Sequence, residues 1–323
     1  MSQPLSLPRQ TNRSATPMEY RPLGQTDLRI SVIGFGASPL GDVFGILDPE
    51  EGARAVQVAI DEGINFFDVS PYYGLTLAEV RLGKALKGRR GDVVLSTKCG
   101  RYEANEFDFS APRVRQSIEE SLGRLDTDYI DLFHAHDVEF GDPDQIVGET
   151  IPAMRRLQEE GKVRYIGISG YPLEVLMSIA DAAPVDAILS YCRYNLLVDD
   201  LSRVLIPFAE ARRIGVINAS PLHMGVLTQQ GAPDWHPAPP QVHQAAREAA
   251  EFCKSRGTNL SDIALQFCVR YSRVATTLVG MSTTQEVYRN LDTLAGTVAP
   301  EVVQQVNAIL APVHNVLWPS GRP

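Results

Sequence analysis

Short apolar runs alternate with amphipathic stretches along most of this chain. The apolar runs are rich in Val, Ile and Phe, which is typical of buried strands. The stretches between them repeat apolar residues with a helical period, and several open at a Pro or a capping residue. Eight strands are expected, at residues 32–36, 65–68, 93–97, 129–135, 163–168, 187–190, 216–218 and 276–279.

Helices are expected between these strands. Ser110 is the predicted N-cap of a helix that opens at Pro112, and Gly161 follows the end of another helix as its C′ glycine. The expected helices cover residues 49–62, 77–86, 112–124, 149–160, a stretch after 172, 201–213, 241–256, 261–271 and a last helix from 284.

This alternation predicts an α/β fold, a single (β/α)8 TIM barrel, because eight parallel strands with helical crossovers close into a barrel. Residues 18–21 and 28–31, joined through Gly24 and Asp27, predict an N-terminal β-hairpin that plugs the bottom of the barrel. Residues 18–323 therefore form one domain. Residues 1–17, rich in Ser, Pro, Thr and Gln, are expected to be a disordered tail.

Composition excludes several classes of protein. Of the 323 residues 44% are hydrophobic and 21% charged, which is ordinary for a soluble domain with a sizeable core. A net charge of -9 without a basic run disfavours nucleic acid as a partner. Residues 1–17 fit neither a secretory signal nor a membrane span, and no membrane partner is expected. Four cysteines without a CxxC pair indicate reduced thiols and a cytoplasmic protein: Cys99, Cys192, Cys253 and Cys268.

Charged and polar side chains stand at the ends of three successive predicted strands. Asp68, Lys98 and His136 occupy these ends, and Tyr73 lies on the loop after the first. A buried carboxylate needs a cation, so Asp68 is expected to pair with Lys98. The ammonium should lower the pKa of Tyr73, and His136 could hydrogen-bond the reacting oxygen. The set suits proton transfer coupled to hydride movement.

From residue 20 onward the chain resembles the aldo-keto reductases, nicotinamide-dependent enzymes on a (β/α)8 barrel. The resemblance rests on GFG at 34–36, FFDVSPYYG at 66–74, STKCG at 96–100, DYIDLFHAH at 128–136 and GKVRYIGIS at 161–169. It implies that Asp68, Tyr73, Lys98 and His136 are the catalytic tetrad, with Tyr73 as general acid in reduction and general base in oxidation.

The resemblance also implies residues that hold the cofactor. Ser169 matches a carboxamide ligand, although Gly170 replaces the asparagine that follows it in the family. Tyr191 takes the place of a glutamine, and Ala219 that of a stacking tyrosine. Further positions carried over are Ser220, Leu222, Gly280, Glu286 and Asn290. A carboxylate at Glu286 would repel a 2′-phosphate and accept a hydrogen bond from a 2′-hydroxyl, so NAD is expected over NADP, with Arg289 as a substitute cation that could reverse this.

Loop segments narrow the expected substrate. FGASPLGDVFG, TKCGRYE, HAHDVEF and ASPLHMGVLT are similar to the L-galactose dehydrogenase branch of the family, which implies NAD-dependent oxidation of an aldose at C1. Asp137, Arg193 and His223 would then form a polar rim for a sugar, unless they form salt bridges instead. The lactone product would lead to ascorbate biosynthesis or to sugar catabolism.

Other functions remain open on the sequence. An L-fucose or D-threo-aldose 1-dehydrogenase, a pyridoxal dehydrogenase and a general carbonyl reductase are alternatives within the family, and some of its barrels serve as regulatory subunits of ion channels. His134 and His136 form an HxH pair, but the remaining histidines do not complete a metal site, so no metal is expected. A monomer and a homodimer are both compatible with the sequence.

Overall fold

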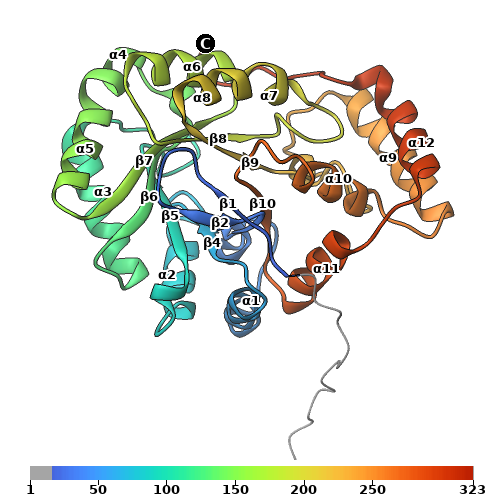
Figure 1. Cartoon of the computed structure of the whole chain (residues 1–323), viewed down its shortest axis with the longest axis horizontal. Helices are drawn as coiled ribbons and strands as arrows, with labels where there is room; N and C mark the ends of the chain where they lie inside the picture. The colour runs from blue at the N-terminus through green and yellow to red at the C-terminus, as the bar shows by residue number, and fades with distance from the viewer. Residues whose placement is uncertain (1–16, 323) are drawn as a thin grey trace, which may run out of the picture.

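The computed structural model describes residues 17–322, which form a closed barrel of parallel strands surrounded by helices (Figure 1). The strand order around the barrel is β10-β3-β4-β5-β6-β7-β8-β9. The strands are β3 (Ile33–Gly36), β4 (Phe66–Asp68), β5 (Val94–Cys99), β6 (Ile130–Ala135), β7 (Val163–Gly170), β8 (Ala187–Tyr191), β9 (Gly215–Ala219) and β10 (Thr276–Gly280). The predicted (β/α)8 barrel is confirmed.

The N-terminal hairpin pairs β1 (Tyr20–Pro22) with β2 (Arg29–Ser31) in antiparallel register. Leu23, Leu28 and Ile30 are buried and pack in one cluster with side chains of the barrel strands, so the hairpin closes the amino end of the barrel as predicted. Gly24 has φ +56°, and a Cβ there would lie 2.4 Å from the backbone nitrogen of Gly215. Only glycine fits this close approach.

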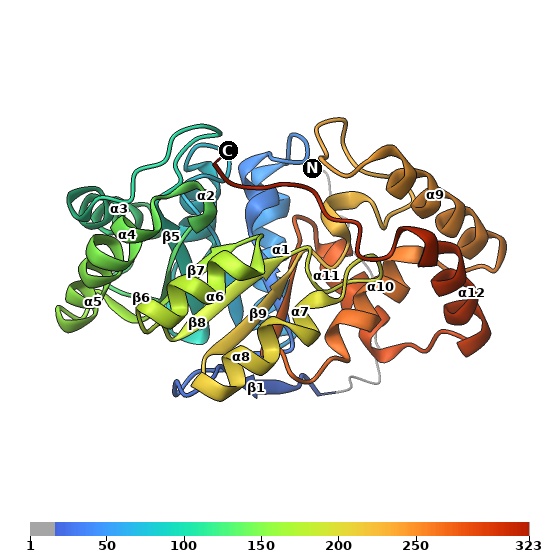
Figure 2. The ribbon, with the colours of Figure 1, turned by 90° about the horizontal axis from the view of Figure 1, so that it is seen from above.

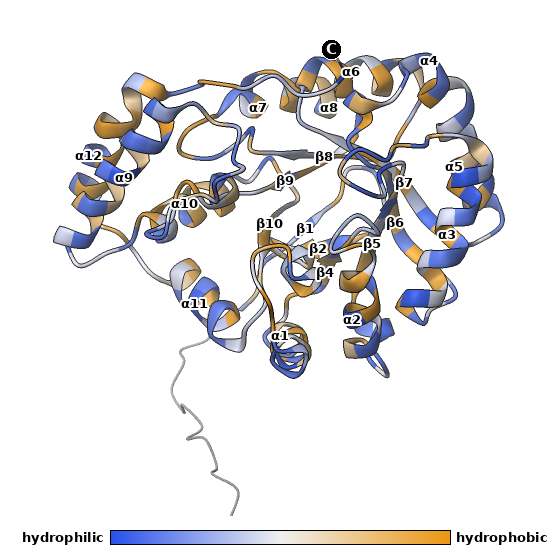
Figure 3. Cartoon of the chain, turned by 180° about the vertical axis from the view of Figure 1, so that it is seen from behind, coloured by the Kyte–Doolittle hydropathy of each residue, from blue (hydrophilic) through white to orange (hydrophobic). Residues whose placement is uncertain are grey.

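The outer layer consists of helices that turn hydrophobic residues inward and hydrophilic residues outward (Figure 3). Because their apolar stripes meet the outer face of the sheet, the main core lies between the two layers. The helices are α1 (Pro49–Asp61), α2 (Leu77–Ala85), α3 (Ala111–Leu125), α4 (Pro143–Gln145), α5 (Ile151–Glu159), α6 (Leu173–Ala182), α7 (Asp200–Arg203), α8 (Leu205–Arg212), α9 (Pro240–Ser255), α10 (Leu260–Val269), α11 (Thr284–Ala295) and α12 (Pro300–Leu310).

Three helical predictions differ from the structure. The stretch 201–213 is interrupted between α7 and α8 at Val204, where φ is -105° and ψ -61°. The helix expected at 149–160 begins earlier, because a π-helical turn at Ile146–Thr150 joins α4 to α5. The helix from 284 is not the last one, since α12 follows it. The apolar side of α12 packs with α9 and α10 in a separate cluster, outside the barrel proper.

The chain leaves α12 and returns across the barrel as an extended C-terminal segment, residues 314–322 (Figure 2). Trp318 on this segment stacks against Tyr171 with a centroid distance of 4.5 Å. The predicted tail 1–17 lies outside the described residues except for Pro17. Within residues 17–322, no helix has both the length and the hydropathy needed to span a membrane.

Candidate active site

The four residues of the predicted tetrad come together at the carboxyl ends of three adjacent strands. Asp68 ends β4, Lys98 lies near the end of β5, and His136 directly follows β6. Tyr73 stands on the loop between β4 and α2. Since β4, β5 and β6 are neighbours in the barrel, residues distant in sequence become a single cluster.

Lys98 is the centre of this cluster. Its Nζ donates to Asp68 Oδ1, to the carbonyl of Val69 at 2.8 Å and to the Tyr73 hydroxyl at 3.3 Å. Asp68 also accepts from Ser96 Oγ at 2.8 Å. Burial lowers the pKa of Lys98, but the Asp68 carboxylate and Tyr73 together outweigh it, and the pKa is raised. Lys98 therefore remains an ammonium, and the predicted pairing with Asp68 is present.

The pKa of Tyr73 differs from the sequence-based expectation. The Lys98 ammonium does lower it, but burial raises it more, so the pKa lies above the ordinary value for tyrosine. The prediction of a net lowered pKa is wrong for the free chain, because the ammonium offsets only part of the desolvation of the phenolate. Tyr73 is thus protonated at neutral pH.

His136 faces Tyr73 edge-on, with ring centroids 5.8 Å apart and an interplanar angle of 88°. Burial, with the charges of Lys98 and Arg101, lowers its pKa well below the ordinary value, so the imidazole is neutral. Nδ1 lies 3.1 Å from Ser70 Oγ, which already accepts from the backbone N–H of Tyr72. When the Ser70 hydroxyl donates to Nδ1, the proton of the neutral imidazole is on Nε2. His136 Nε2–H is then a hydrogen-bond donor at the site.

The residues proposed to hold a cofactor lie at the carboxyl ends of the remaining strands. Ser169 is buried near the end of β7, and its Oγ accepts from the backbone N–H of Asp137 at 3.4 Å. Tyr191 ends β8, with its hydroxyl 3.5 Å from Glu139 Oε1. Ser220 follows β9 in the left-handed region, and half-buried Leu222 comes just after it. Gly280 ends β10 and is exposed.

Glu286 has a structural partner that the sequence analysis did not assign. It forms a capping box with Thr283 at the start of α11, and its Oε2 accepts from Ser282 N at 2.7 Å and from Thr283 N at 3.0 Å. Arg289, one turn later, donates to Asp262 Oδ1 at 3.2 Å. Asn290 is half-buried on the same helix. The Glu286 carboxylate is thus fixed beside the end of β10, and the Arg289 guanidinium is paired with Asp262.

Of the three predicted substrate residues, Asp137 and Arg193 form salt bridges and His223 is buried. Asp137 lies beside the tetrad, with Oδ1 3.7 Å from His136 Nε2, and pairs with Arg101 at 2.5 Å. Arg193 pairs with Asp200, so the salt-bridge alternative holds for it. His223 is completely buried, with Nδ1 3.1 Å from Asn195 Nδ2.

Sequence reasoning missed Arg101, Ser70 and Glu139, each of which contacts a predicted site residue. Two of them stand inside the motifs TKCGRYE and HAHDVEF, within three residues of a residue that was selected. Position next to a strand end was therefore a usable signal for them.

A metal site is not found in the described part of the chain, where no three His, Cys, Asp or Glu side chains are grouped to hold an ion. Burial lowers the pKa of His134 to about 3, and a Cβ on Gly167 would lie 2.5 Å from its Nδ1. His134 is therefore a tightly packed neutral core residue.

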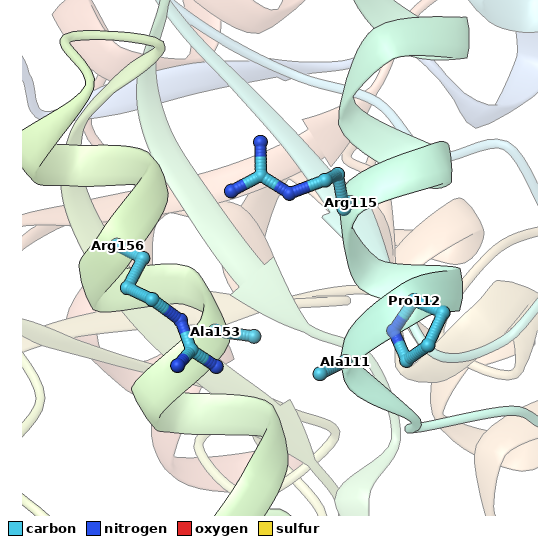
Figure 4. A pocket seen from close by; sticks show the side chains of 5 residues that line it. All are labelled: Ala111, Pro112, Arg115, Ala153 and Arg156. Atoms are coloured by element: carbon cyan, nitrogen blue, oxygen red, sulfur yellow. The ribbon is translucent and has the colours of Figure 1, made fainter.

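A cavity of about 270 Å³ lies between α3 and α5 on the outer layer, away from the strand ends (Figure 4). Its lining is Ala111, Pro112, Arg115, Ala153 and Arg156. Arg115 pairs with Glu160, so its charge is already neutralised, and the cavity contains none of the tetrad.

Comparison with known proteins gives the same fold and relates the chain to sugar dehydrogenases. It is 48% identical over 317 residues to L-galactose dehydrogenase of Arabidopsis thaliana, covering 95% of this chain and 98% of that protein. It is 34% identical to D-arabinose 1-dehydrogenase of Saccharomyces cerevisiae, over 73% of this chain and 74% of the relative.

Among solved structures, the holo form of an aldo-keto reductase from Bacillus halodurans matches with a TM-score of 0.76 and 30% identity, over 90% of this chain and 96% of that one. The profile of the Aldo/keto reductase family matches residues 32–311. The chain belongs to this family and is therefore an oxidoreductase.

Proposed function

We propose that this protein is an NAD-dependent aldose 1-dehydrogenase that oxidises L-galactose at C1 to L-galactono-1,4-lactone, with Tyr73 as general base. The observation that supports this most is the cluster in which Lys98 Nζ contacts both Asp68 and the Tyr73 hydroxyl beside a neutral His136. The 48% identity to L-galactose dehydrogenase over nearly the whole chain supports the substrate.

The residues present fit a nicotinamide cofactor. Ser169 offers a hydroxyl and Tyr191 a half-buried aromatic ring at neighbouring strand ends. Ser220 and Leu222 follow β9, the next strand, where backbone groups can approach a pyrophosphate. A bound nicotinamide would supply a hydride acceptor. Gly280, Glu286 and Asn290 would contact the adenosine end of the cofactor.

In the proposed mechanism the sugar places its O1 between the Tyr73 hydroxyl and His136 Nε2. Tyr73, as phenolate, takes the proton of the anomeric hydroxyl while hydride leaves C1. Lys98 stabilises the phenolate, and Asp68 holds Lys98 in position. The Nε2–H of His136 donates to O1 and stabilises the charge that develops there. Because Tyr73 is protonated in the free chain, oxidation requires that it first lose its proton.

Glu286 and Arg289 support NAD over NADP. The Glu286 carboxylate would repel a 2′-phosphate. Arg289, which could have compensated, is held by Asp262. We also propose a cytoplasmic location, which is in keeping with the buried free thiols of the four cysteines.

Initial rates with NAD and NADP test this proposal, measured against L-galactose, L-fucose, L-glucose, D-arabinose and pyridoxal by absorbance of the reduced cofactor. A preference for L-galactose with NAD is expected. A preference for L-fucose or pyridoxal would select one of the alternative dehydrogenases. Reduction of simple aldehydes with NADPH and no sugar oxidation would identify a general reductase, and no turnover at all would favour a regulatory binding role.

A further inference from the structure

Arg101 has no role in the proposed mechanism, yet it stands at the edge of the tetrad. It lies on the loop between β5 and α3, with a half-buried side chain. Nη1 donates to Asp137 Oδ2 at 2.5 Å, and Nη2 donates to the hydroxyl of Tyr72 at 3.1 Å. Its guanidinium carbon lies 3.9 Å from the centroid of the Tyr72 ring. Arg101 thus links two residues that each adjoin a member of the tetrad.

Asp137 is held in an unusual position. It follows His136 with φ +52°, in the left-handed region, and only 3% of the residue is exposed. Arg101 occupies Oδ2, whereas Oδ1 forms no hydrogen bond with any residue between 17 and 322. The residue as a whole is almost entirely buried, so its second carboxylate oxygen is free to accept a hydrogen bond from a bound ligand. An open carboxylate oxygen 3.7 Å from His136 Nε2 therefore indicates a ligand group.

Arg101 shows the complementary feature. Its Nε is buried and has no hydrogen-bond partner among the described residues. Arg101 and Asp137 are joined by an ion pair, and each keeps one group free for a hydrogen bond: a donor, Nε, and an acceptor, Oδ1. This pair suits hydroxyl groups, because a hydroxyl both donates and accepts.

The distance to the reacting centre identifies which hydroxyl this would be. This step rests on the proposed function, in which His136 Nε2 holds the reacting oxygen. The oxygens of a vicinal diol are separated by about the length of a hydrogen bond. When the reacting oxygen lies at His136 Nε2, the hydroxyl on the next carbon is therefore the one within reach of Asp137 Oδ1. Hydroxyls farther along the sugar lie farther from the reacting oxygen than this one does.

We propose that Asp137 and Arg101 form the subsite for the hydroxyl group at C2, so that the enzyme selects 2-hydroxy aldehydes and aldoses over aldehydes that lack this group. Asp137 accepts from the hydroxyl. Arg101 is the positioning residue, because it fixes Oδ2 and turns Oδ1 toward the site. Substrates without the hydroxyl leave the carboxylate oxygen buried and unpaired, a situation that polar sites reject strongly.

The test compares pairs of substrates that differ only at C2: lactaldehyde with propanal in reduction, and L-galactose with 2-deoxy-L-galactose in oxidation. For the wild-type chain we expect kcat/KM to favour the hydroxylated member by at least ~100-fold. Asp137→Asn and Arg101→Gln should each reduce this ratio by roughly tenfold or more, mainly through KM of the hydroxylated substrate. Arg101→Lys should recover part of it.

Arg113→Gln is the matched control, since Arg113 also lies over a tyrosine ring, 3.6 Å from the centroid of Tyr102, but contacts none of the tetrad. Its selectivity should equal that of the wild type. Equal losses on both members of a pair in the Asp137 and Arg101 variants would mean a purely structural role and overturn the proposal, as would a wild-type chain without selectivity. If L-galactose is not oxidised but lactaldehyde is selected over propanal, the proposed substrate fails and the C2 subsite stands.

Discussion

Glu139 should make the stability of this protein fall as pH rises from about 4.5 to about 7. It is 7% exposed, and its Oε1 accepts from Tyr171 N at 3.1 Å and from Ser320 Oγ at 3.0 Å. Burial, with the nearby charge of Asp137, raises the pKa of Glu139 from 4.5 to about 7. The group therefore joins the rim of the site to the C-terminal segment and titrates in the physiological range.

The size and sign of the effect follow from proton linkage. Between about pH 4.5 and 7 the folded chain keeps a proton on Glu139 that the unfolded chain has released. The contribution is complete below pH 4.5 and is lost as pH rises toward 7. The pKa of Glu139 is higher in the folded chain than in the unfolded chain, by an amount that corresponds to about 3 kcal/mol of unfolding free energy as an upper bound.

Urea unfolding at pH 5 and pH 8 measures this directly. Glu139→Gln removes the titrating group but keeps an acceptor for Tyr171 and Ser320. The unfolding free energy of the variant relative to that of the wild type should rise by about 2–3 kcal/mol from pH 5 to pH 8. Glu251→Gln, an exposed substitution on α9, should leave the pH dependence unchanged. Parallel pH profiles for wild type and Glu139→Gln would refute the reasoning.

Three further predictions concern the site. Lys98→Met should lower the unfolding free energy by about 3–5 kcal/mol, because it leaves Asp68 buried and unpaired, and adding Asp68→Asn should recover part of this loss in urea titrations. Since burial raises the pKa of Tyr73, kcat/KM for sugar oxidation should rise with pH above neutrality; a flat profile would contradict Tyr73 as base. Glu286→Gln keeps the capping box but removes the charge, so kcat/KM with NADP relative to NAD should rise roughly fivefold, the equivalent of about 1 kcal/mol, and an unchanged ratio would remove Glu286 from cofactor choice.

The barrel and the tetrad were predictable because both depend on local sequence. Strand and helix periods alternate clearly, and each tetrad residue stands at or just after a strand end, as with Asp68 and His136. Parallel closure then brings those ends together without further information. The N-terminal hairpin followed from Gly24 and two short apolar runs for the same reason.

Contacts between distant segments were not predictable in this way. Glu139 meets Ser320, which lies 181 residues later, and the sequence contains no pattern that pairs them. The partners of Arg193 and Glu286 are only a few residues away, but whether a charged side chain turns to a neighbour or to a ligand depends on packing. The pKa of Tyr73 was misjudged because burial, which sequence does not quantify, outweighs the ammonium.

The central claim is that Tyr73 takes the proton of the anomeric hydroxyl while the hydride of C1 passes to NAD. Oxidation of L-galactose labelled with deuterium at C1, followed by mass spectrometry of the cofactor, tests it most directly. We expect deuterium in the reduced NAD formed by the wild type. In Tyr73→Phe we expect turnover slower by at least ~10³-fold, with NAD binding retained in calorimetric titration. Reduced NAD without deuterium, or a Tyr73→Phe variant that turns over near the wild-type rate, would contradict it.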